Sequence, residues 1–453
     1  MRLSVASNYD PRLVEGLAGY PVEEVYGKLP ADCLGGGRAS YMLGPLSRRR
    51  LAEHAAHVRR AGMRFNYLLN AACWDNRETT RRGQRELRGL LDWIVSIGAG
   101  AVTVSIPSIL ALIKRSYPAL HTRVSVFACV DSVQKARYWE DAGADCICLD
   151  SLQVNREFRA LEAIRRHVSC DLQLLVNNSC LQHCSLAHAH MTHLAHASQK
   201  GHASGGFLVD WCFLKCTAMK LDDPVNYIRA DWIRPEDLGE YERLGYENFK
   251  IVERNAPTDL LLARVKAYSE RRYEGNLLDL VQPYGHGERW RKGEDTGRAR
   301  RWRLRHLVRP WKLGLSPALR LKALAEARGF LPGTNGGALS SGETNGGPLH
   351  EKNGGPMHSG ESNGGAAGAG GRNGDPVYVD NRALDGFIER FRRLGCRDVS
   401  CEACGHCREY AGRAVVIDPA FRERCRALYA SLFRDMDTGA FFGCAPRRGE
   451  HVS

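Results

Sequence analysis

The sequence predicts an α/β protein whose largest part is a closed, TIM-like parallel (β/α) barrel. Over residues 1–275, short apolar runs rich in β-branched residues alternate with longer amphipathic runs, which is the pattern of repeated strand–helix units. Several of the short runs are apolar on both faces, as buried parallel strands are. No G-x-G-x-x-G pattern follows the first strand, which argues against an open dinucleotide-binding sheet.

The individual elements follow from these runs. The predicted strands are residues 3–7, 23–27, 65–70, 101–106, 124–130, 146–149, 172–176 and 249–252. The predicted helices are residues 47–61, 82–97, 132–141, 156–168 and 258–271. About eight strands with helical crossovers favour a closed barrel over an open doubly wound sheet.

Three further segments follow the barrel. Residues 276–332 are expected to form a basic extension, with ten Lys and Arg against two acidic residues between Arg289 and Lys312. Interleaved tryptophans would let this extension bind nucleic acid, but a solvated extension after the barrel is the favoured interpretation. Residues 333–375, rich in Gly and Asn, are expected to be a disordered linker. Residues 376–453 regain apolar periodicity around a cysteine-dense stretch and are expected to form a small Cys-rich, metal-binding domain.

Composition and cysteine content narrow the class of protein. The N-terminus lacks the pattern of a secretory signal, and no run approaches the roughly 18–20 apolar residues that span a bilayer. We therefore expect a cytoplasmic protein without a membrane partner. Disulfides are rare in that compartment, so 16 cysteines point to metal or redox chemistry. Four cysteines next to apolar runs are expected to be buried hydrophobic residues instead: Cys129, Cys146, Cys148 and Cys170.

Two C-x3-C pairs form the first cysteine constellation. Cys180 and Cys184 follow the predicted strand 172–176, at the end of the strand where active-site loops of α/β barrels lie. Cys212 and Cys216 repeat the spacing, and two such pairs can converge on one centre. Four thiolates suit a 4Fe-4S cluster or tetrahedral zinc, and the spacing favours the cluster because zinc prefers C-x2-C. Neighbouring histidines leave a mixed His/Cys site as an alternative: His183, His188, His190, His193 and His196.

Three segments resemble a known family: LLVNNSCLQHC, DWIRPEDLGEYERLG and NFKIVERNAPTDLLLARVKAYSERRYEGN. They are similar to the peptidase U32 family, a collagenase-like group that also includes oxygen-independent hydroxylases. Lys250, Glu253 and Arg254 stand where that family shows a lysine-to-arginine signature after its final strand. The resemblance covers roughly residues 1–275. It implies a barrel and a 4Fe-4S cluster, carried here by the two cysteine pairs. Only LQH separates the first two cysteines, where the family has a wider gap, so the chain resembles a divergent member.

The resemblance implies two different activities. A peptidase needs a nucleophile with a base or a metal-bound water. The metalloprotease pattern H-E-x-x-H is absent, and G-x-S-x-G occurs only within the Gly/Asn-rich linker, away from any predicted strand. The hydroxylases use a chorismate-pathway acid as oxygen donor, and such an anion requires cationic side chains. We therefore expect an iron–sulfur enzyme that hydroxylates or otherwise modifies a small molecule or RNA. A U32-type peptidase and a non-catalytic iron–sulfur subunit are the alternatives.

Four residues are candidates for substrate binding by their positions near the predicted strand ends. They are Asn177, Arg234, Lys250 and Arg254. The three cations could instead form ordinary ion pairs, and the asparagine could cap a turn. No catalytic residue is predicted.

A second constellation lies near the C-terminus, in the pattern C-x4-C-x2-C-x2-C. Its members are Cys396, Cys401, Cys404 and Cys407. The C-x2-C-x2-C part resembles a ferredoxin cluster loop, but C-x2-C is also the usual spacing of zinc sites, so a second 4Fe-4S cluster or Zn is expected. A cluster would relay electrons to the barrel, whereas zinc would indicate docking of RNA or protein. The expected partners are a small-molecule substrate or RNA, an electron-donor protein and a homologous partner subunit.

Overall fold

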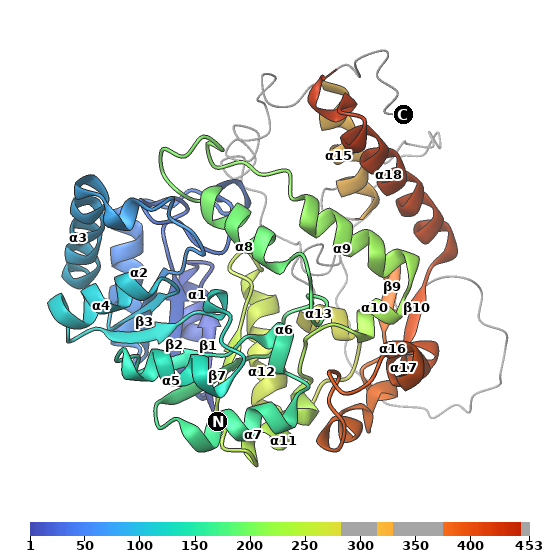
Figure 1. The fold of residues 1–453 in the computed structure, drawn as a ribbon, viewed down its shortest axis with the longest axis horizontal. Helices are drawn as coiled ribbons and strands as arrows, with labels where there is room; N and C mark the ends of the chain where they lie inside the picture. The colour runs from blue at the N-terminus through green and yellow to red at the C-terminus, as the bar shows by residue number, and fades with distance from the viewer. Residues whose placement is uncertain (282–314, 329–374, 445–453) are drawn as a thin grey trace, which may run out of the picture.

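The computed structural model describes residues 1–281, 315–328 and 375–444 (Figure 1). A closed barrel of parallel strands, hydrogen-bonded in the order β1 to β8, forms its centre and confirms the predicted fold. β8 pairs with β1 from Arg2–Asn248 to Val5–Ile251, which closes the ring. The strands are β1 (Arg2–Ala6), β2 (Val22–Gly27), β3 (Arg64–Leu69), β4 (Ala101–Val104), β5 (His121–Val124), β6 (Cys146–Cys148), β7 (Asp171–Leu175) and β8 (Asn248–Ile251).

The strand predicted at residues 124–130 is wrong, whereas the other predicted strands coincide with the observed ones to within two residues. β5 ends at Val124, where the predicted strand begins. The hydroxyl of Ser125 accepts the N–H of Phe127 at 3.2 Å and starts a short 3-10 turn, after which Cys129 has a left-handed φ of 52°. The β-like run VSVFACV therefore lies mostly beyond the strand, at the rim of the barrel.

Helices surround the barrel, and five of them were predicted. These are α2 (Arg48–Arg60), α3 (Arg81–Ser96), α5 (Val133–Asp141), α7 (Phe158–His167) and α12 (Thr258–Glu270). The prediction missed α1 (Pro11–Gly16), α4 (Pro107–Ser116), α6 (Ser151–Val154), α8 (Ala187–His196), α9 (Trp211–Asp222), α10 (Val225–Ile228) and α11 (Leu238–Glu242). The last four lie within the β7–β8 connection. Histidines and cysteines obscure the amphipathic pattern of α8 and α9, whereas α10 and α11 are too short to show one.

The interior of the barrel is polar. Glu24 and Arg123 form an ion pair whose side chains are 1% and 3% exposed. Asn66 donates to Glu24 at 2.9 Å, and Thr103 donates to Asn66 at 3.0 Å. Arg123 also donates to the hydroxyl of Ser4 at 3.1 Å. This network satisfies polar groups that would otherwise be costly to bury.

Residues 375–444 pack against the barrel and share its hydrophobic core. β9 (Val377–Val379) pairs antiparallel with β10 (Val415–Ile417). The side chain of Asn276, next to α13 (Leu277–Val281), donates to the carbonyl oxygen of Val377 at 2.9 Å and accepts the N–H of Val379 at 3.0 Å. The guanidinium of Arg156 lies 4.6 Å from the Trp232 ring centroid and 4.8 Å from that of Phe387. Figure 1 shows α18 (Pro419–Asp437) beside α9 and α15 (Leu315–Ala327). The Cys-rich segment therefore packs against helices of the β7–β8 connection.

Two predicted segments lie outside the described residues: the basic block between Arg289 and Lys312, and the linker 333–375 apart from Asp375. In the part of the chain that the structure describes, every helix is too short or too polar to serve as a membrane span.

His54 of α2 makes the stability of the fold dependent on pH. Its Nε2 lies 2.8 Å from the hydroxyl of Ser7, and its ring packs against Tyr9 and Phe65. Burial lowers the pKa of His54 to about 4, so the folded chain keeps this ring neutral. The unfolded chain takes up a proton near pH 6.5, so stability is lost as pH falls below that value.

We expect the free energy of unfolding to fall by roughly 2 kcal/mol between neutral pH and about pH 5 on account of His54. Urea titrations at the two pH values measure it. A His54→Phe variant, which has no titrating ring there, should lose this part of the pH dependence. The same dependence in the variant and the unaltered protein would contradict the assignment.

Candidate functional site

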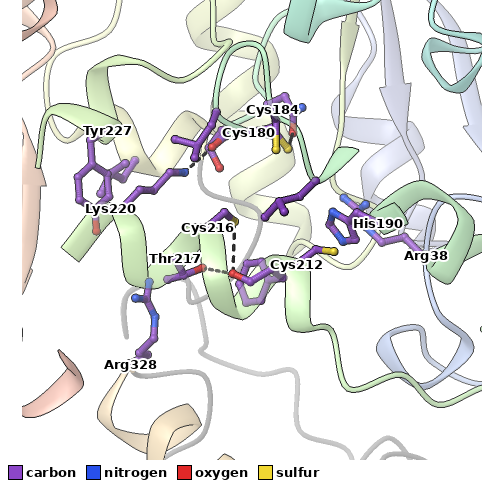
Figure 2. Close-up of a pocket in the computed structure, with 16 residues that line it drawn as sticks. Arg38, Cys180, Cys184, His190, Cys212, Cys216, Thr217, Lys220, Tyr227 and Arg328 are labelled. Carbon is purple, nitrogen blue, oxygen red and sulfur yellow. Dashed lines mark hydrogen bonds between the residues drawn. The ribbon is translucent and has the colours of Figure 1, made fainter. Parts of the chain in front are cut away.

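The connection between β7 and β8 carries both pairs of the first cysteine constellation. Cys180 and Cys184 lie in the irregular stretch that follows β7, and Cys212 and Cys216 lie on α9. All four line one cavity of about 90 Å³ (Figure 2). This volume is several times the ~10–15 Å³ that one water needs, so the cavity can hold a group of several atoms. The structure therefore brings the two predicted pairs together.

The walls of this first cysteine cavity are held by hydrogen bonds. Asp210 caps α9 by accepting the N–H of Phe213 at 3.0 Å, and it also contacts Nε2 of His190 at 2.8 Å. Lys220 donates to the carbonyl of Ser179, which ties α9 to the loop after β7. Of the five histidines in the segment, only His190 lines the cavity, so a mixed His/Cys ligand set would draw on this residue.

Burial raises the pKa of each thiol in the first cysteine cavity. The pKa of Cys212 is raised to about 11, and burial together with nearby Asp231 raises that of Cys180 further. The pKa values of Cys184 and Cys216 are also raised, first by burial. Without a metal these thiols would be protonated and inert. A metal centre would have to displace their protons, because the thiolate is the ligand.

Buried cations gather at the barrel mouth beside this cavity. Lys250 is 6% exposed, and its Nζ lies 4.3 Å from the ring centroid of Tyr26. Arg254 is also 6% exposed, and its Nη1 is buried without a hydrogen-bond partner among the described residues. Burial lowers the pKa of both side chains. Lys28 adds a further buried cation, paired with Asp32 at 2.9 Å.

Arg38 links the barrel mouth to the first cysteine cavity. It lines the cavity and pairs with Glu253 after β8 at 3.3 Å. The preceding Gly35 has a φ of +81°, and a Cβ there would meet the carbonyl oxygen of Ala195 at 2.5 Å. Glycine is therefore needed where this loop crosses α8. The prediction missed Arg38, although the run GGGR marked a close backbone approach.

Asn177 and Arg234 are both predicted to bind substrate, but in the structure their side chains form hydrogen bonds within the protein. The Asn177 amide donates to the carbonyl oxygens of Val252 and Leu280 at 3.2 and 3.1 Å. Its oxygen accepts the N–H of Val252 at 2.7 Å. These bonds clamp the ends of β7 and β8 together.

Arg234 joins the barrel to the C-terminal segment. Its guanidinium contacts Asp237 at 3.1 Å, Asp385 at 3.0 Å and the carbonyl oxygen of Asn381 at 2.6 Å. The side chain is 2% exposed. It serves as a buried junction between the two parts of the chain.

The second cysteine constellation also surrounds one cavity, of about 30 Å³. Cys401 and Cys404 lie on α16 (Cys401–Cys404), and Cys407 lies on α17 (His406–Ala414). Burial raises the pKa of Cys396 to about 12, against the opposing effect of Arg156. Three arginines line this second cysteine cavity, and their charge would balance that of metal-bound thiolates: Arg229, Arg390 and Arg408.

Comparisons with known proteins agree with the resemblance seen in the sequence. Residues 36–204 match the model of peptidase family U32. An uncharacterized protease of Methanocaldococcus jannaschii is 32% identical over 258 residues, which cover 57% of this chain and 75% of that protein. A solved U32 peptidase, Mk0906, is 19% identical with a TM-score of 0.42, covering 56% of this chain and 93% of its own. FabK from Thermotoga maritima is 11% identical with a TM-score of 0.25, covering 44% of this chain and 56% of its own. The chain belongs to peptidase family U32.

Proposed function

We propose that this chain is an oxygen-independent modifying enzyme that binds a small anionic molecule in the barrel mouth, beside a 4Fe-4S cluster. The observation that carries the proposal is the convergence of Cys180, Cys184, Cys212 and Cys216 on one cavity. Two distant segments of chain supply these thiols, and packing alone gives no reason for four of them to line one hollow. A bound cluster would supply a redox centre next to the substrate.

The spacing of the sulfurs supports a cluster over zinc. Four thiolates bound to zinc at about 2.3 Å lie about 3.8 Å apart. Within the described residues, no three sulfurs of either cysteine constellation lie within 4.8 Å of one another. The sulfurs of either constellation therefore do not form a closed tetrahedral zinc site in this structure.

The charge of the barrel mouth supports an anionic substrate or co-substrate. Lys250 and Arg254 are buried, and Nη1 of Arg254, which has no hydrogen-bond partner among the described residues, can meet a carboxylate. Inserting one oxygen atom into a C–H bond oxidises the substrate by two electrons. Without molecular oxygen, a carboxylic acid that gives up an oxygen atom accepts those two electrons. Arg38, between this mouth and the cysteine cavity, would orient the acid toward the redox centre.

The second cysteine cavity fits a relay to the first. Arg229 lines the second cavity, and Tyr227, two positions earlier in the chain, lines the first. α10 and its C-terminal end therefore contribute side chains to the walls of both cavities. A redox centre in the second cavity would exchange electrons between a donor protein and the barrel cluster to set the oxidation state of that cluster before turnover, with no net electrons consumed by the reaction. Zinc there would make the segment a docking module.

The protease names of the relatives keep peptidase activity as the second candidate. A Ser–His hydrogen bond does occur, between Ser7 and His54. Ser7 has no exposed surface and His54 is 6% exposed, so a peptide bond would not reach the pair. We therefore favour the modifying enzyme.

Anaerobic purification of the full chain, followed by iron, zinc and sulfide assays, tests the proposed cofactor. Iron and sulfide in about equal amounts are expected, because a 4Fe-4S cluster contains equal numbers of both. Zinc without sulfide would contradict the proposal.

A deletion strain tests the activity. Mass analysis should find a metabolite that lacks one oxygen atom relative to its normal form. Complementation with the unaltered gene should restore the normal form, and Arg254→Met should fail while its purified protein keeps iron and sulfide. Exposed Arg166→Met is the matched control and should restore it. A missing oxygen on an RNA base would identify RNA as the substrate. Unchanged metabolites and RNA would contradict the hydroxylase.

A further inference from the structure

A third group of metal-ligating side chains lies outside both cysteine cavities. The sulfur of Cys73, a carboxylate oxygen of Asp75 and a ring nitrogen of His196 all lie within 4.8 Å of one another. Cys73 and Asp75 follow β3, whereas His196 is the last residue of α8. We propose that these three side chains bind a divalent transition metal, with Zn²⁺ as the best match.

The types of donor atom select this class of metal. Thiolate, imidazole and carboxylate are the three ligand types that Zn²⁺ takes in proteins, whereas a thiolate does not suit Mg²⁺ or Ca²⁺. Three protein ligands leave the fourth tetrahedral position for water. Asp75 is exposed, so solvent reaches the metal position.

The loop after β3 is held in the shape that presents Cys73 and Asp75. Trp74 between them is 1% exposed, and its Nε1 donates to the carbonyl of Cys33 at 2.6 Å. The N–H of Asp75 donates to the sulfur of Cys73 at 3.4 Å, which fixes the position of the sulfur beside the carboxylate. Gln199, just beyond α8, donates to the carbonyl of Cys73 at 2.7 Å. The ligands from the loop and from α8 therefore face each other before any metal binds.

The contact between His196 and Asp75 places two donor atoms where one metal ion could bind both. Nε2 of His196 lies 3.1 Å from the Asp75 carboxylate, and this nitrogen is buried without a hydrogen-bond partner among the described residues. The unprotonated nitrogen of a neutral imidazole and a carboxylate oxygen both offer lone pairs, so either the ring's own proton on Nε2 or a metal ion lies between them. The nearby sulfur of Cys73 supplies the third donor that a metal needs and a simple ion pair does not.

His202 supports the site without being a ligand. Its ring stacks on that of His196 with a centroid distance of 4.6 Å, and its Nε2 lies 3.9 Å from Asp75. Its Nδ1 accepts the N–H of Ser204 at 3.1 Å, so the neutral ring carries its proton on Nε2. That proton points to the carboxylate and leaves the metal position to the other three side chains.

The proposed metal would anchor the wall of the first cysteine cavity. His190, which lines that cavity, and His196 lie six residues apart on α8, or about 9 Å along the helix. A metal that joins His196 to the β3 loop would fix the C-terminal end of α8. This site is separate from the proposed redox centre, so the two can be tested independently.

The test compares zinc binding by four full-length proteins purified without air: the unaltered chain, Cys73→Ser, His196→Gln and the control His193→Gln. His193 lies exposed on the same helix and is not among the three ligands. After dialysis against Zn²⁺ with a competing chelator, the unaltered chain and the control should hold one more zinc per chain than the other two. Iron and sulfide should be equal in all four.

Two further readouts keep the result interpretable. Co²⁺ loaded in place of zinc should show a thiolate-to-cobalt absorption that Cys73→Ser lacks. Added Zn²⁺ should raise the melting temperature of the unaltered chain and of the control only, because a ligand of the folded state stabilises it. Equal zinc content in all four proteins would overturn the proposal and leave Asp75 and His196 as an ion pair.

Discussion

Replacing Cys180 or Cys212 by alanine is expected to remove the iron of the cluster proposed in the first cysteine cavity, together with its thiolate-to-iron absorption. Each residue supplies one of four thiols in the first cysteine cavity, and they come from separate segments. A 4Fe-4S cluster held by three thiolates exposes one iron, and in a buried site the lost ligand has no replacement of the same charge. Visible absorption and iron assays on anaerobically purified protein measure the loss.

A metal centre in the second cysteine constellation would add its own iron and absorption, so its ligands must be removed for this measurement. The substitutions are therefore made in a chain that already carries Cys401→Ser and Cys404→Ser. Cys170→Ala is the control, because Cys170 is half-buried and lines neither cysteine cavity. Full absorption in the Cys180→Ala and Cys212→Ala proteins would contradict the ligand assignment.

Arg123→Met is expected to destabilise the fold by about 3–5 kcal/mol, because it leaves Glu24 buried without its cation. Both side chains lie inside the barrel, 3% and 1% exposed, and neither can reach solvent without disrupting the strands. Urea unfolding at neutral pH measures the effect.

Two further variants identify the cause. Adding Glu24→Gln to Arg123→Met removes the buried charge, so the double variant should be more stable than the single one. The matched surface pair is Glu162 and Arg166, whose side chains are 45% and 70% exposed. Arg166→Met should cost no more than about 1 kcal/mol. Equal losses of unfolding free energy for Arg123→Met and Arg166→Met would show that the buried pair contributes no more to stability than the surface pair.

Local patterns were sufficient to predict the barrel. Strands buried on both faces and amphipathic helices each leave a periodic pattern within a few residues, and both repeat along residues 1–275. The pattern failed at residues 124–130, since a serine side chain bonded the backbone and ended β5 early. It also failed for α8 and α9, where histidines and cysteines interrupt the apolar stripe, and for α10 and α11, which are too short to carry a period of 3.6.

The roles of single polar residues could not be predicted in the same way. Arg234 was expected to bind substrate, but its partner Asp385 lies far along the chain in the C-terminal segment. Asn177 was expected at the barrel mouth, yet its amide joins the ends of β7 and β8. Arg38, which lines the first cysteine cavity, was missed because its neighbour Glu253 is equally remote. A sequence records which side chains are present, whereas their partners depend on how distant segments pack.

The sequence by itself determined the class of fold, the family resemblance and the two cysteine constellations, because each depends on spacing within a short stretch of chain. Only the tertiary structure decided that Cys180 and Cys184 meet Cys212 and Cys216 over one cavity, and that Cys73 and Asp75 face His196. Barrel closure and the course of the long β7–β8 connection bring these side chains close together. They are set by the packing of whole elements, which no local pattern specifies.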